Sequence, residues 1–400
     1  MTVPPINVLL VEDNPTDALL VRATLNATVG SGFEVVTVDH LDAAIRRAKY
    51  EPFDVILLDL GLPDSRGIES FEHLHAATPD IPIIVLSGLG DDEIAMQAVQ
   101  QGGQDYLPKG QGIGDLLPRA IRYAIERHRA QMELARHAAL LKKKNEVLEE
   151  EFRMAREIQQ ALLPHQYPEF QINQKSALRF AHCYHPAAAL SGDFFSVQRL
   201  SDHQAGVLIC DVMGHGVRAA LIGALTRGLI DQFLPIATQP GEFLSALNHG
   251  LSETLKQAEI DAFATAFYFV ADLNKQEVAY ANAGHPSAML LQRDAGTANW
   301  LTVRGHGYPP LGLLGDADYP TFQSPLSPND SIVLFTDGLY EAENAMGEAF
   351  GRERLLAAVR RRLQTPGAKL LKELVMESQK FSGVQEFIDD VCLVGMDVMI

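Results

Sequence analysis

The chain has only three cysteines, Cys183, Cys210 and Cys392, and no two of them form a CxxC pair. Thiols this few and this scattered exclude a disulfide framework and fit a reducing compartment. Long apolar runs are also missing, since none approaches the roughly 20 residues that a membrane span requires. The first residues lack the basic segment and apolar run of a signal peptide. We therefore expect a cytoplasmic protein with no membrane partner.

Basic residues are scarce relative to acidic ones. The 33 lysines and arginines face 51 aspartates and glutamates, which gives a net charge of −18. Nucleic acids and anionic membranes bind basic surfaces, so both are excluded as general partners. At about 100–200 residues per domain, the length predicts two or three domains. A hydrophobic content of 47% allows each of them a sizeable core.

Residues 6–125 alternate short apolar runs with amphipathic segments such as residues 41–50 and 91–101. The apolar runs are residues 6–11, 33–38, 53–58, 81–86 and 105–107. Nearly continuous apolar strands are needed where both faces of a sheet are buried. The alternation therefore predicts an α/β, doubly wound domain with helices on both faces of a parallel sheet.

Residues 115–163 have the pattern of one long helix, because glycine is absent throughout and proline is absent from residue 119 onward. A seam with alternating spacings of four and three is typical of a coiled coil. The seam consists of Leu134, Ala138, Leu141, Asn145, Leu148, Phe152, Ala155, Gln159 and Leu162. Upstream, Ile121, Ile125 and Met132 fit only after a register shift. We expect a parallel homodimer with its register fixed by Asn145, and the alternative is a solvated linker helix.

The remainder, from about residue 164, reads as an α+β domain with mostly antiparallel strands. Strand-like runs occur at residues 205–210, 265–271, 276–281, 287–292, 331–335 and 391–398. Helical patterns occur at residues 217–233, 241–257 and 353–381. The predicted boundaries are residues 1–125 for the first domain, 126–163 for the coiled-coil helix and 164–400 for the last domain.

Polar side chains stand where the predicted strands of the first domain end. Glu12 and Asp13 follow the first run, Asp59 ends the third, Ser87 the fourth, and Lys109 follows the fifth. Ligands of open α/β sheets bind at this edge. Crowded carboxylates favour a hard divalent cation, most simply Mg²⁺. A metal and a lysine can neutralise a transferring phosphoryl group, and a carboxylate can accept one.

These residues stand in the motifs VEDNP (11–15), LLDLGLPD (57–64), VLSG (85–88) and YLPKG (106–110). Together the motifs resemble the receiver domain of bacterial response regulators, the flavodoxin-like fold of CheY. The resemblance implies that Asp59 accepts a phosphoryl group from an upstream histidine kinase or phosphotransfer protein. It also implies that Ser87 and Lys109 contact the phosphoryl oxygens and that Tyr106 is a rotameric switch.

The same resemblance implies a Mg²⁺ site in this domain. Its ligands would be Asp13, Asp59 and the backbone carbonyl of Gly61. Glu12 would act mainly through metal-bound water.

Separated aspartates in the last domain share a context beside a strand or a glycine turn. Asp193 lies in LSGDFF, Asp211 opens DVMGHG, Asp337 lies in TDG, and Asp389 and Asp390 precede the terminal strand. If these strand ends converge, they form an all-oxygen site for two divalent metals. Two such ions can orient and acidify a bridging water and hold a phosphate for in-line attack.

Two histidines near these aspartates have alternative readings. His215 is either a ligand or a turn-packing residue, and the preference of hard cations for oxygen favours the second. His285 is either catalytic or a residue that orients its loop, and the second is favoured. The glycines at 214 and 216 are not a dinucleotide-binding fingerprint, since the third glycine of GxGxxG is missing.

This half resembles the type 2C metal-dependent serine/threonine phosphatases, in the bacterial branch typified by RsbU and SpoIIE. The motifs are SGDFF, DVMGHG, NAGHP, PPLGLLG (309–315), FTDGLYE (335–341) and DDV, preceded by AREIQQALLP (155–164). The resemblance implies an antiparallel β-sandwich flanked by helices. It also implies hydrolysis of phosphoserine or phosphothreonine, with a phosphorylated anti-sigma-factor antagonist as substrate and partner switching toward a sigma factor as the outcome.

The resemblance also implies the ligands of two Mn²⁺ or Mg²⁺ ions. Asp211 would bridge the ions and hold the catalytic water between them, helped by the backbone carbonyl of Val212. Asp337 and Asp389 would complete the shell of one ion, and Asp390 is an alternative to Asp389.

The chain departs from the branch pattern near its first aspartate. The branch often has GGD where this chain has SGD (191–193), and often has an acidic residue where this chain has Ser196. Asp193 would bind metal-coordinated water or a further, weakly held ion.

The sequence therefore predicts a two-component response regulator in which phosphorylation of Asp59 controls a protein phosphatase. The alternative is a non-catalytic adaptor that binds a sigma factor or its regulator. Retention of the four separated aspartates favours the enzyme. A transcription factor lacks support, because no helix-turn-helix candidate with a basic face follows the first domain.

Overall fold

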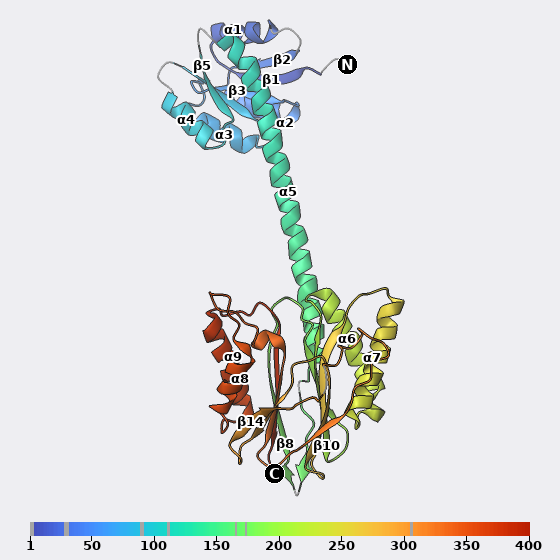
Figure 1. Ribbon diagram of the computed structural model, residues 1–400. Coiled ribbons are helices and arrows are strands. Elements are labelled where there is room, and N and C mark those ends of the chain that lie inside the picture. The colour runs from blue at the N-terminus through green and yellow to red at the C-terminus, as the bar shows by residue number, and fades with distance from the viewer. Residues whose placement is uncertain are drawn as a thin grey trace. The chain divides into compact units, whose positions relative to one another are not determined.

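The computed structural model describes residues 4–27, 32–88, 92–109, 113–164, 166–172, 174–304 and 307–400. The chain divides into two compact units, Met1–Glu146 and Val147–Ile400. One continuous helix, α5 (Ile113–Leu162), belongs to the first unit at its start and to the second at its end (Figure 1).

The first unit is a parallel five-stranded sheet with the strand order β2-β1-β3-β4-β5. The strands are β1 Ile6–Val11, β2 Phe33–Val38, β3 Val55–Asp59, β4 Ile83–Ser87 and β5 Asp105–Pro108. The helices besides α5 are α1 Pro15–Asn26, α2 Leu41–Tyr50, α3 Ile68–Ala77 and α4 Asp92–Gln100. The predicted doubly wound α/β fold is confirmed.

Both faces of this sheet are buried. Val8 and Leu10 pack with α1 and the start of α5, whereas Leu9 and Val11 pack with α2, α3 and α4. Successive side chains of a strand point to opposite faces, so both sets must be apolar. Each large apolar side chain buried in this way stabilises the fold by about 1.5–3 kcal/mol.

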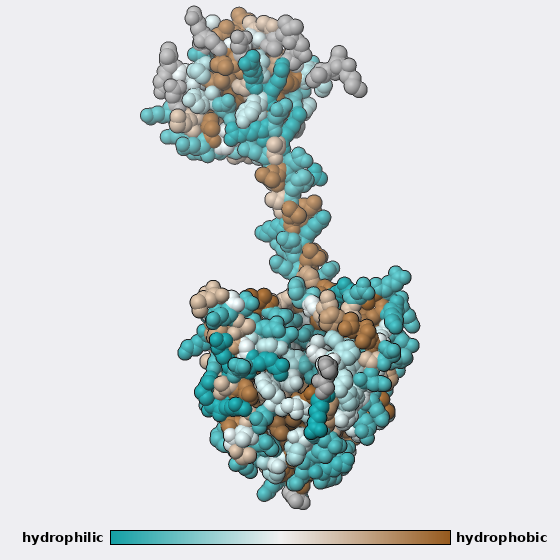
Figure 2. Space-filling view, viewed as in Figure 1, coloured by the Kyte–Doolittle hydropathy of each residue, from teal (hydrophilic) through white to brown (hydrophobic). Residues whose placement is uncertain are grey.

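Helix α5 is 50 residues long, about 75 Å at 1.5 Å per residue. Ile121 and Ile125 pack in the core of the first unit, which explains why they do not share the register of the seam that follows. From Leu134 to Phe152 the seam is uncovered in this chain, with Leu134 and Leu141 70% and 61% exposed. Figure 2 shows hydrophobic side chains interspersed with polar ones along this part of the helix.

The second unit contains two antiparallel five-stranded sheets, with the orders β15-β12-β11-β10-β9 and β14-β13-β16-β17-β8. The first comprises β9 Phe194–Arg199, β10 Gln204–Val212, β11 Ala264–Asp272, β12 Glu277–Ala283 and β15 Phe322–Pro325. The second comprises β8 Leu178–His185, β13 Met289–Gln292, β14 Thr297–Trp300, β16 Ser331–Phe335 and β17 Val391–Val398. Two short strands, β6 Gln171–Ile172 and β7 Lys175–Ser176, pair separately.

The two sheets pack against each other around a shared core, in which Phe267 and Ile209 of one sheet meet Leu334 and Val394 of the other. Helices α6 Val217–Gln232 and α7 Pro240–Gln257 cover the first sheet. Helices α8 Gly351–Arg360 and α9 Gly367–Ser382 cover the second (Figure 1). The predicted antiparallel sandwich flanked by helices is confirmed.

One predicted helix is two helices. The pattern at residues 353–381 reads as continuous, but α8 stops at Arg360 and α9 begins at Gly367, directly after Pro366. Proline has no N–H to donate within a helix, so a new helix starts after it. In the part of the chain that the structure describes, no helix is both long enough and apolar enough to cross a membrane.

Candidate functional site

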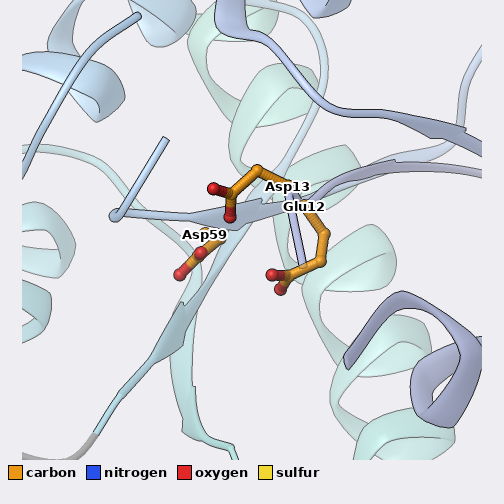
Figure 3. A group of neighbouring side chains, drawn as sticks. All are labelled: Glu12, Asp13 and Asp59. Carbon is orange, nitrogen blue, oxygen red and sulfur yellow. The ribbon is translucent and has the colours of Figure 1, made fainter. Parts of the chain in front are cut away.

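Three carboxylates meet at the carboxyl end of the sheet in the first unit (Figure 3). Glu12 and Asp13 follow β1, and Asp59 ends the neighbouring strand β3. One oxygen from each lies within 4.8 Å of the others. Glu12 and Asp59 are buried and Asp13 is exposed, so the group is an all-oxygen site open to solvent on one side, which suits Mg²⁺.

The ammonium group of Lys109 lies against these carboxylates. Its Nζ is 2.6 Å from Glu12 Oε2 and 3.0 Å from Asp59 Oδ1. Burial acts to lower the pKa of Lys109, but its hydrogen bonds to Glu12 and Asp59 outweigh burial and the pKa is raised. A third carboxylate, Asp17 of α1, lies 3.4 Å from Nζ. Sequence reasoning missed Asp17, because it lies in a helix rather than at a strand end.

Three other predicted residues surround the same edge. The Ser87 hydroxyl at the end of β4 is buried without a hydrogen-bond partner among the described residues, so it is free to donate to an incoming oxyanion. A Cβ atom on Gly61 would lie 3.6 Å from Asp59 Oδ2, which places the backbone of residue 61 beside the carboxylate. Tyr106 in β5 is half-buried and packs against the core below α4.

The second unit gathers its aspartates where four strands begin or end. Asp211 lies near the end of β10, and Asp193 immediately precedes β9, which pairs with β10. Asp337 follows β16, and Asp389 precedes β17, which pairs with β16. The hydroxyl of Thr336 donates to Asp193 Oδ2 at 2.7 Å, which joins these strand ends across the two sheets.

The carboxyls of Asp193 and Asp211 share a hydrogen bond. Asp193 is 1% exposed, and burial, followed by the charge of Asp211, raises its pKa well above the usual range. Burial, followed by the charge of Asp337, raises the pKa of Asp211 to about 7. Such a pair of acids is stable only when a proton or a cation compensates its charge.

Further acidic groups adjoin this pair. Burial, followed by the charge of Asp389, raises the pKa of Asp337. Glu341 has a raised pKa through burial and the charges of Asp337 and Asp389, and sequence reasoning gave Glu341 no role. Within the described ranges, only Glu12, Asp13 and Asp59 bring three such oxygens within 4.8 Å, so the carboxylates of the second unit are more widely spaced.

The adjacent Asp389 and Asp390 have different environments. Asp390 is buried, and its two oxygens accept hydrogen bonds from the backbone N–H groups of Ala187 and Gly192, at 2.8 and 3.0 Å. It therefore holds the loop that leads to Asp193. The exposed Asp389 lies near the charges of Asp211 and Asp337, and its Oδ1 accepts a hydrogen bond from the backbone N–H of Asp390 at 2.8 Å.

The predicted backbone ligand, the carbonyl of Val212, faces the loop that carries Asp193. A Cβ atom on Gly192 would lie 2.6 Å from Val212 O and 3.2 Å from Gly214 O. Real Cβ atoms do not approach backbone oxygens so closely, so only glycine fits at position 192.

The last turns of α5 hold the other side of this loop. Gln159 Nε2 donates to Ser191 O at 2.5 Å, and Ser191 N donates to Gln159 Oε1 at 3.2 Å. Arg156 donates to the carbonyls of Ala188 and Ala189 at 2.9 and 2.8 Å. The loop before Asp193 is therefore held on one side by Asp390, which directly precedes β17. On the other side it is held by Gln159 and Arg156 of α5.

The two histidines differ in exposure. His215 is exposed on the loop after Asp211. His285 is buried, and its Nδ1 lies 2.7 Å from the hydroxyl of Thr265. Burial lowers the pKa of His285 to about 3, against a smaller opposing effect of the Phe335 backbone, so the ring is neutral.

Comparisons with known proteins agree with this division of the chain. Residues 8–121 match the model of the response regulator receiver domain, and residues 201–399 match that of stage II sporulation protein E. The phosphoserine phosphatase RsbP of Bacillus subtilis is 27% identical over 54% of this chain and 51% of its own length. The KDP operon transcriptional regulatory protein KdpE of Escherichia coli is 38% identical over 31% of this chain and 53% of its own length. The chain thus spans about half the length of each relative.

The fold of the second unit is also found in a solved structure. The SiaA-PP2C domain of Pseudomonas aeruginosa superposes with a TM-score of 0.54 at 22% identity, covering 64% of this chain and 98% of that domain. Fold and comparisons together define a response regulator receiver followed by a domain of the type 2C phosphatase fold. The N-terminal part of the chain thus matches the receiver family, and the C-terminal part matches the stage II sporulation protein E family.

Proposed function

We propose that the protein is a response regulator whose output is a divalent-metal-dependent phosphoserine or phosphothreonine protein phosphatase. The observation that supports this best is the contact between the buried carboxyl of Asp193 and the half-buried carboxyl of Asp211, beside the charges of Asp337 and Asp389. Donor sets made of oxygen favour hard ions such as Mn²⁺ and Mg²⁺. The name of RsbP, a phosphoserine phosphatase, supports the same reaction class.

The proposed ligands are those predicted from the sequence. Asp211, helped by the carbonyl of Val212, would hold the two ions, Asp337 and Asp389 would complete the shell of one of them, and Asp193 would bind coordinated water or a further ion. When bound, the ions supply an acidified water and neutralise the substrate phosphate. The protein keeps the donors in place, since Thr336 fixes the Asp193 carboxylate.

In the first unit we propose Asp59 as the phospho-acceptor, with a histidine kinase or phosphotransfer protein as donor. Asp13 and Asp59 hold Mg²⁺ with the Gly61 carbonyl, and Glu12 acts through water. The Lys109 ammonium already contacts Asp59, so it is placed to contact an oxygen of a phosphoryl group on that residue.

Two further receiver residues complete the proposed phosphoryl site. The hydroxyl of Ser87, which has no partner in the described part of the chain, supplies a hydrogen bond to the phosphoryl group. Tyr106 changes rotamer in response, as expected of the switch residue.

We propose that α5 transmits the signal. The boundaries 1–125, 126–163 and 164–400 make this helix the connection between input and output. Pairing of two copies along the exposed seam would set the rotation of its last turns. Gln159 and Arg156 in those turns hold the backbone of residues 188–191, so a rotation would shift the loop that places Asp193.

The proposed substrate is a phosphorylated anti-sigma-factor antagonist, and its dephosphorylation would change the partner of a sigma-factor regulator. A test of the activity is Mn²⁺-dependent hydrolysis of p-nitrophenyl phosphate and of a phosphoserine peptide by the full chain. We expect turnover by the wild type and none by Asp211→Ala. We also expect the rate to change when beryllium fluoride, a phosphoryl mimic, is added, and not to change in Asp59→Asn.

The outcomes of this experiment separate the two candidate functions. Mn²⁺ binding without any hydrolysis would contradict the enzyme and favour the adaptor. Hydrolysis at the same rate with and without the mimic would contradict only the control by Asp59. It would not contradict the phosphatase activity.

A further inference from the structure

His285 is a buried polar residue of the second unit that the proposed mechanism does not use. It lies two residues beyond β12 and is 5% exposed, so no substrate can reach it. Its backbone is fixed by Asn282, whose Oδ1 accepts from His285 N and whose Nδ2 donates to His285 O, each at 2.8 Å. Because both polar groups of this buried amide are bonded to the backbone of His285, that backbone is held in a single position.

The ring of His285 lies between β11, which pairs with the strand that carries Asp211, and the end of β16. On one side, its Nδ1 is 2.7 Å from Thr265 Oγ1. Thr265 in β11 is the residue directly opposite Asp211 in the antiparallel pairing of β10 and β11. On the other side is the backbone of Phe335, the residue that ends β16 two positions before Asp337.

This arrangement places a neutral side chain against the strands next to the acidic cluster. A cationic group there would compete with metal ions for the carboxylates, whereas a neutral imidazole offers a hydrogen bond and volume without charge. Removing one partner of a buried hydrogen bond is destabilising and leaves the other partner free to move. Here that partner is the hydroxyl of Thr265, across from Asp211.

We infer that His285 is a positioning residue of the metal centre, which acts through Thr265 to set where Asp211 lies relative to Asp337. The inference deepens the proposed function and rests on the metal site proposed there. His285 itself binds neither metal nor substrate. It sets the distance between the carboxylates of Asp211 and Asp337, which lie at strand ends of two different sheets.

The test measures Mn²⁺ binding to the full-length protein by calorimetry, alongside its thermal unfolding in EDTA. We expect His285→Ala and Thr265→Val each to weaken Mn²⁺ binding by about tenfold, the lower end of the effect of residues that support metal ligands. The double variant should bind as weakly as either single variant, because both changes remove one interaction. His285→Asn, which keeps a polar atom near the position of Nδ1, should bind more tightly than His285→Gln.

The matched control is Tyr280→Phe in β12, which removes a hydrogen bond of 2.8 Å from the Tyr280 hydroxyl to Thr302 O. It should lower the unfolding temperature and leave Mn²⁺ affinity unchanged. The inference is overturned if the His285 variants lose only stability, as this control does, or if the effects of His285→Ala and Thr265→Val add. Wild-type protein that binds Mn²⁺ but hydrolyses no phosphate ester would contradict the proposed function and leave this inference standing.

Discussion

The side-chain amide of Gln159 in α5 is hydrogen-bonded to both backbone polar groups of Ser191. Its Nε2 donates to the carbonyl at 2.5 Å, and its Oε1 accepts from the N–H at 3.2 Å. Ser191 Oγ in turn accepts from the backbone N–H of Asp193 at 3.0 Å. The proposed metal ligand Asp193 is therefore only two positions along the chain from Ser191, which contacts α5 directly.

Replacement of Gln159 by alanine should reduce phosphatase activity without preventing phosphorylation of Asp59. Two hydrogen bonds to the backbone of Ser191 disappear, at about 0.5–1.5 kcal/mol each, and the loop before Asp193 gains freedom. We expect kcat/KM for p-nitrophenyl phosphate with Mn²⁺ to fall by about tenfold. Gln160→Ala is the control, since Gln160 is exposed on the same turn. Equal activity of the two variants would contradict a role for this contact.

Metal binding should depend on pH through the protonation of the carboxyls. Burial, with the charge of Asp337, raises the pKa of Asp211 to about 7, so a proton competes with the cation below that pH. Mn²⁺ affinity should rise between about pH 6 and pH 8, with proton release on binding. Calorimetry in buffers of different ionisation enthalpy measures that release. Affinity that does not change over this range would show that Asp211 does not titrate there.

Stability without metal should change with pH in the opposite direction. Between the ordinary aspartate pKa of about 4 and about pH 7, the folded chain retains a proton on Asp211 that the unfolded chain has lost. The free energy of unfolding in EDTA should therefore fall as the pH rises through this window and level off above it. Urea unfolding at several pH values measures the slope. Asp211→Asn should reduce the slope, and an unchanged slope would assign it to other groups.

The neighbours Asp389 and Asp390 should respond differently to the same change. Asp389→Asn should weaken Mn²⁺ binding by about tenfold or more and leave stability nearly unchanged, because Asp389 is exposed. Asp390→Asn should lower the free energy of unfolding by about 1–3 kcal/mol, since an amide cannot accept both hydrogen bonds from Ala187 and Gly192. Calorimetry and urea unfolding of both variants check this. The reverse pattern would make Asp390 the ligand.

Loss of the Lys109 ammonium should strengthen Mg²⁺ binding in the first unit. The ammonium neutralises Glu12 and Asp59 at 2.6 and 3.0 Å, so Lys109→Ala leaves those charges to the cation alone. We expect several-fold tighter Mg²⁺ binding by calorimetry, together with loss of the response to beryllium fluoride. Lys49→Ala, on the surface of α2, is the control. Unchanged Mg²⁺ affinity would show that Lys109 and the metal do not compete.

The sequence was most informative about the fold where burial left little choice. Residues 55–58 before Asp59 are apolar because β3 is buried on both faces, and such runs predicted the strands of the first sheet. The amphipathic pattern of residues 353–381 was misleading, because it continues across a break whose local signal is the pair Pro366 and Gly367. Periodicity reports which face is buried, and it does not report where a helix stops.

For the sites, the sequence predicted the residues at strand ends, where topology brings side chains together. It did not find Asp17 or Glu341, and it placed Gln159 on the coiled-coil seam without its contact to Ser191. Each of these residues is brought close to a site residue by the packing of a helix or a turn. A local sequence motif carries no information about such a distance. The separate environments of Asp389 and Asp390 also arise only from the fold, since adjacent residues of identical type have the same local sequence signal.

The exposed seam of α5 should hold two copies of the chain together. Leu141 and Leu148 are 61% and 49% exposed, and a helix of this length cannot bury such a stripe against either unit alone. Leu141→Lys with Leu148→Lys should convert a dimer to a monomer in sedimentation experiments, because both charges would be buried in the seam. Lys142→Ala, off the seam, should not. If the charged variant still responds to beryllium fluoride, the signal passes along a single helix, and pairing is not required to reach Gln159.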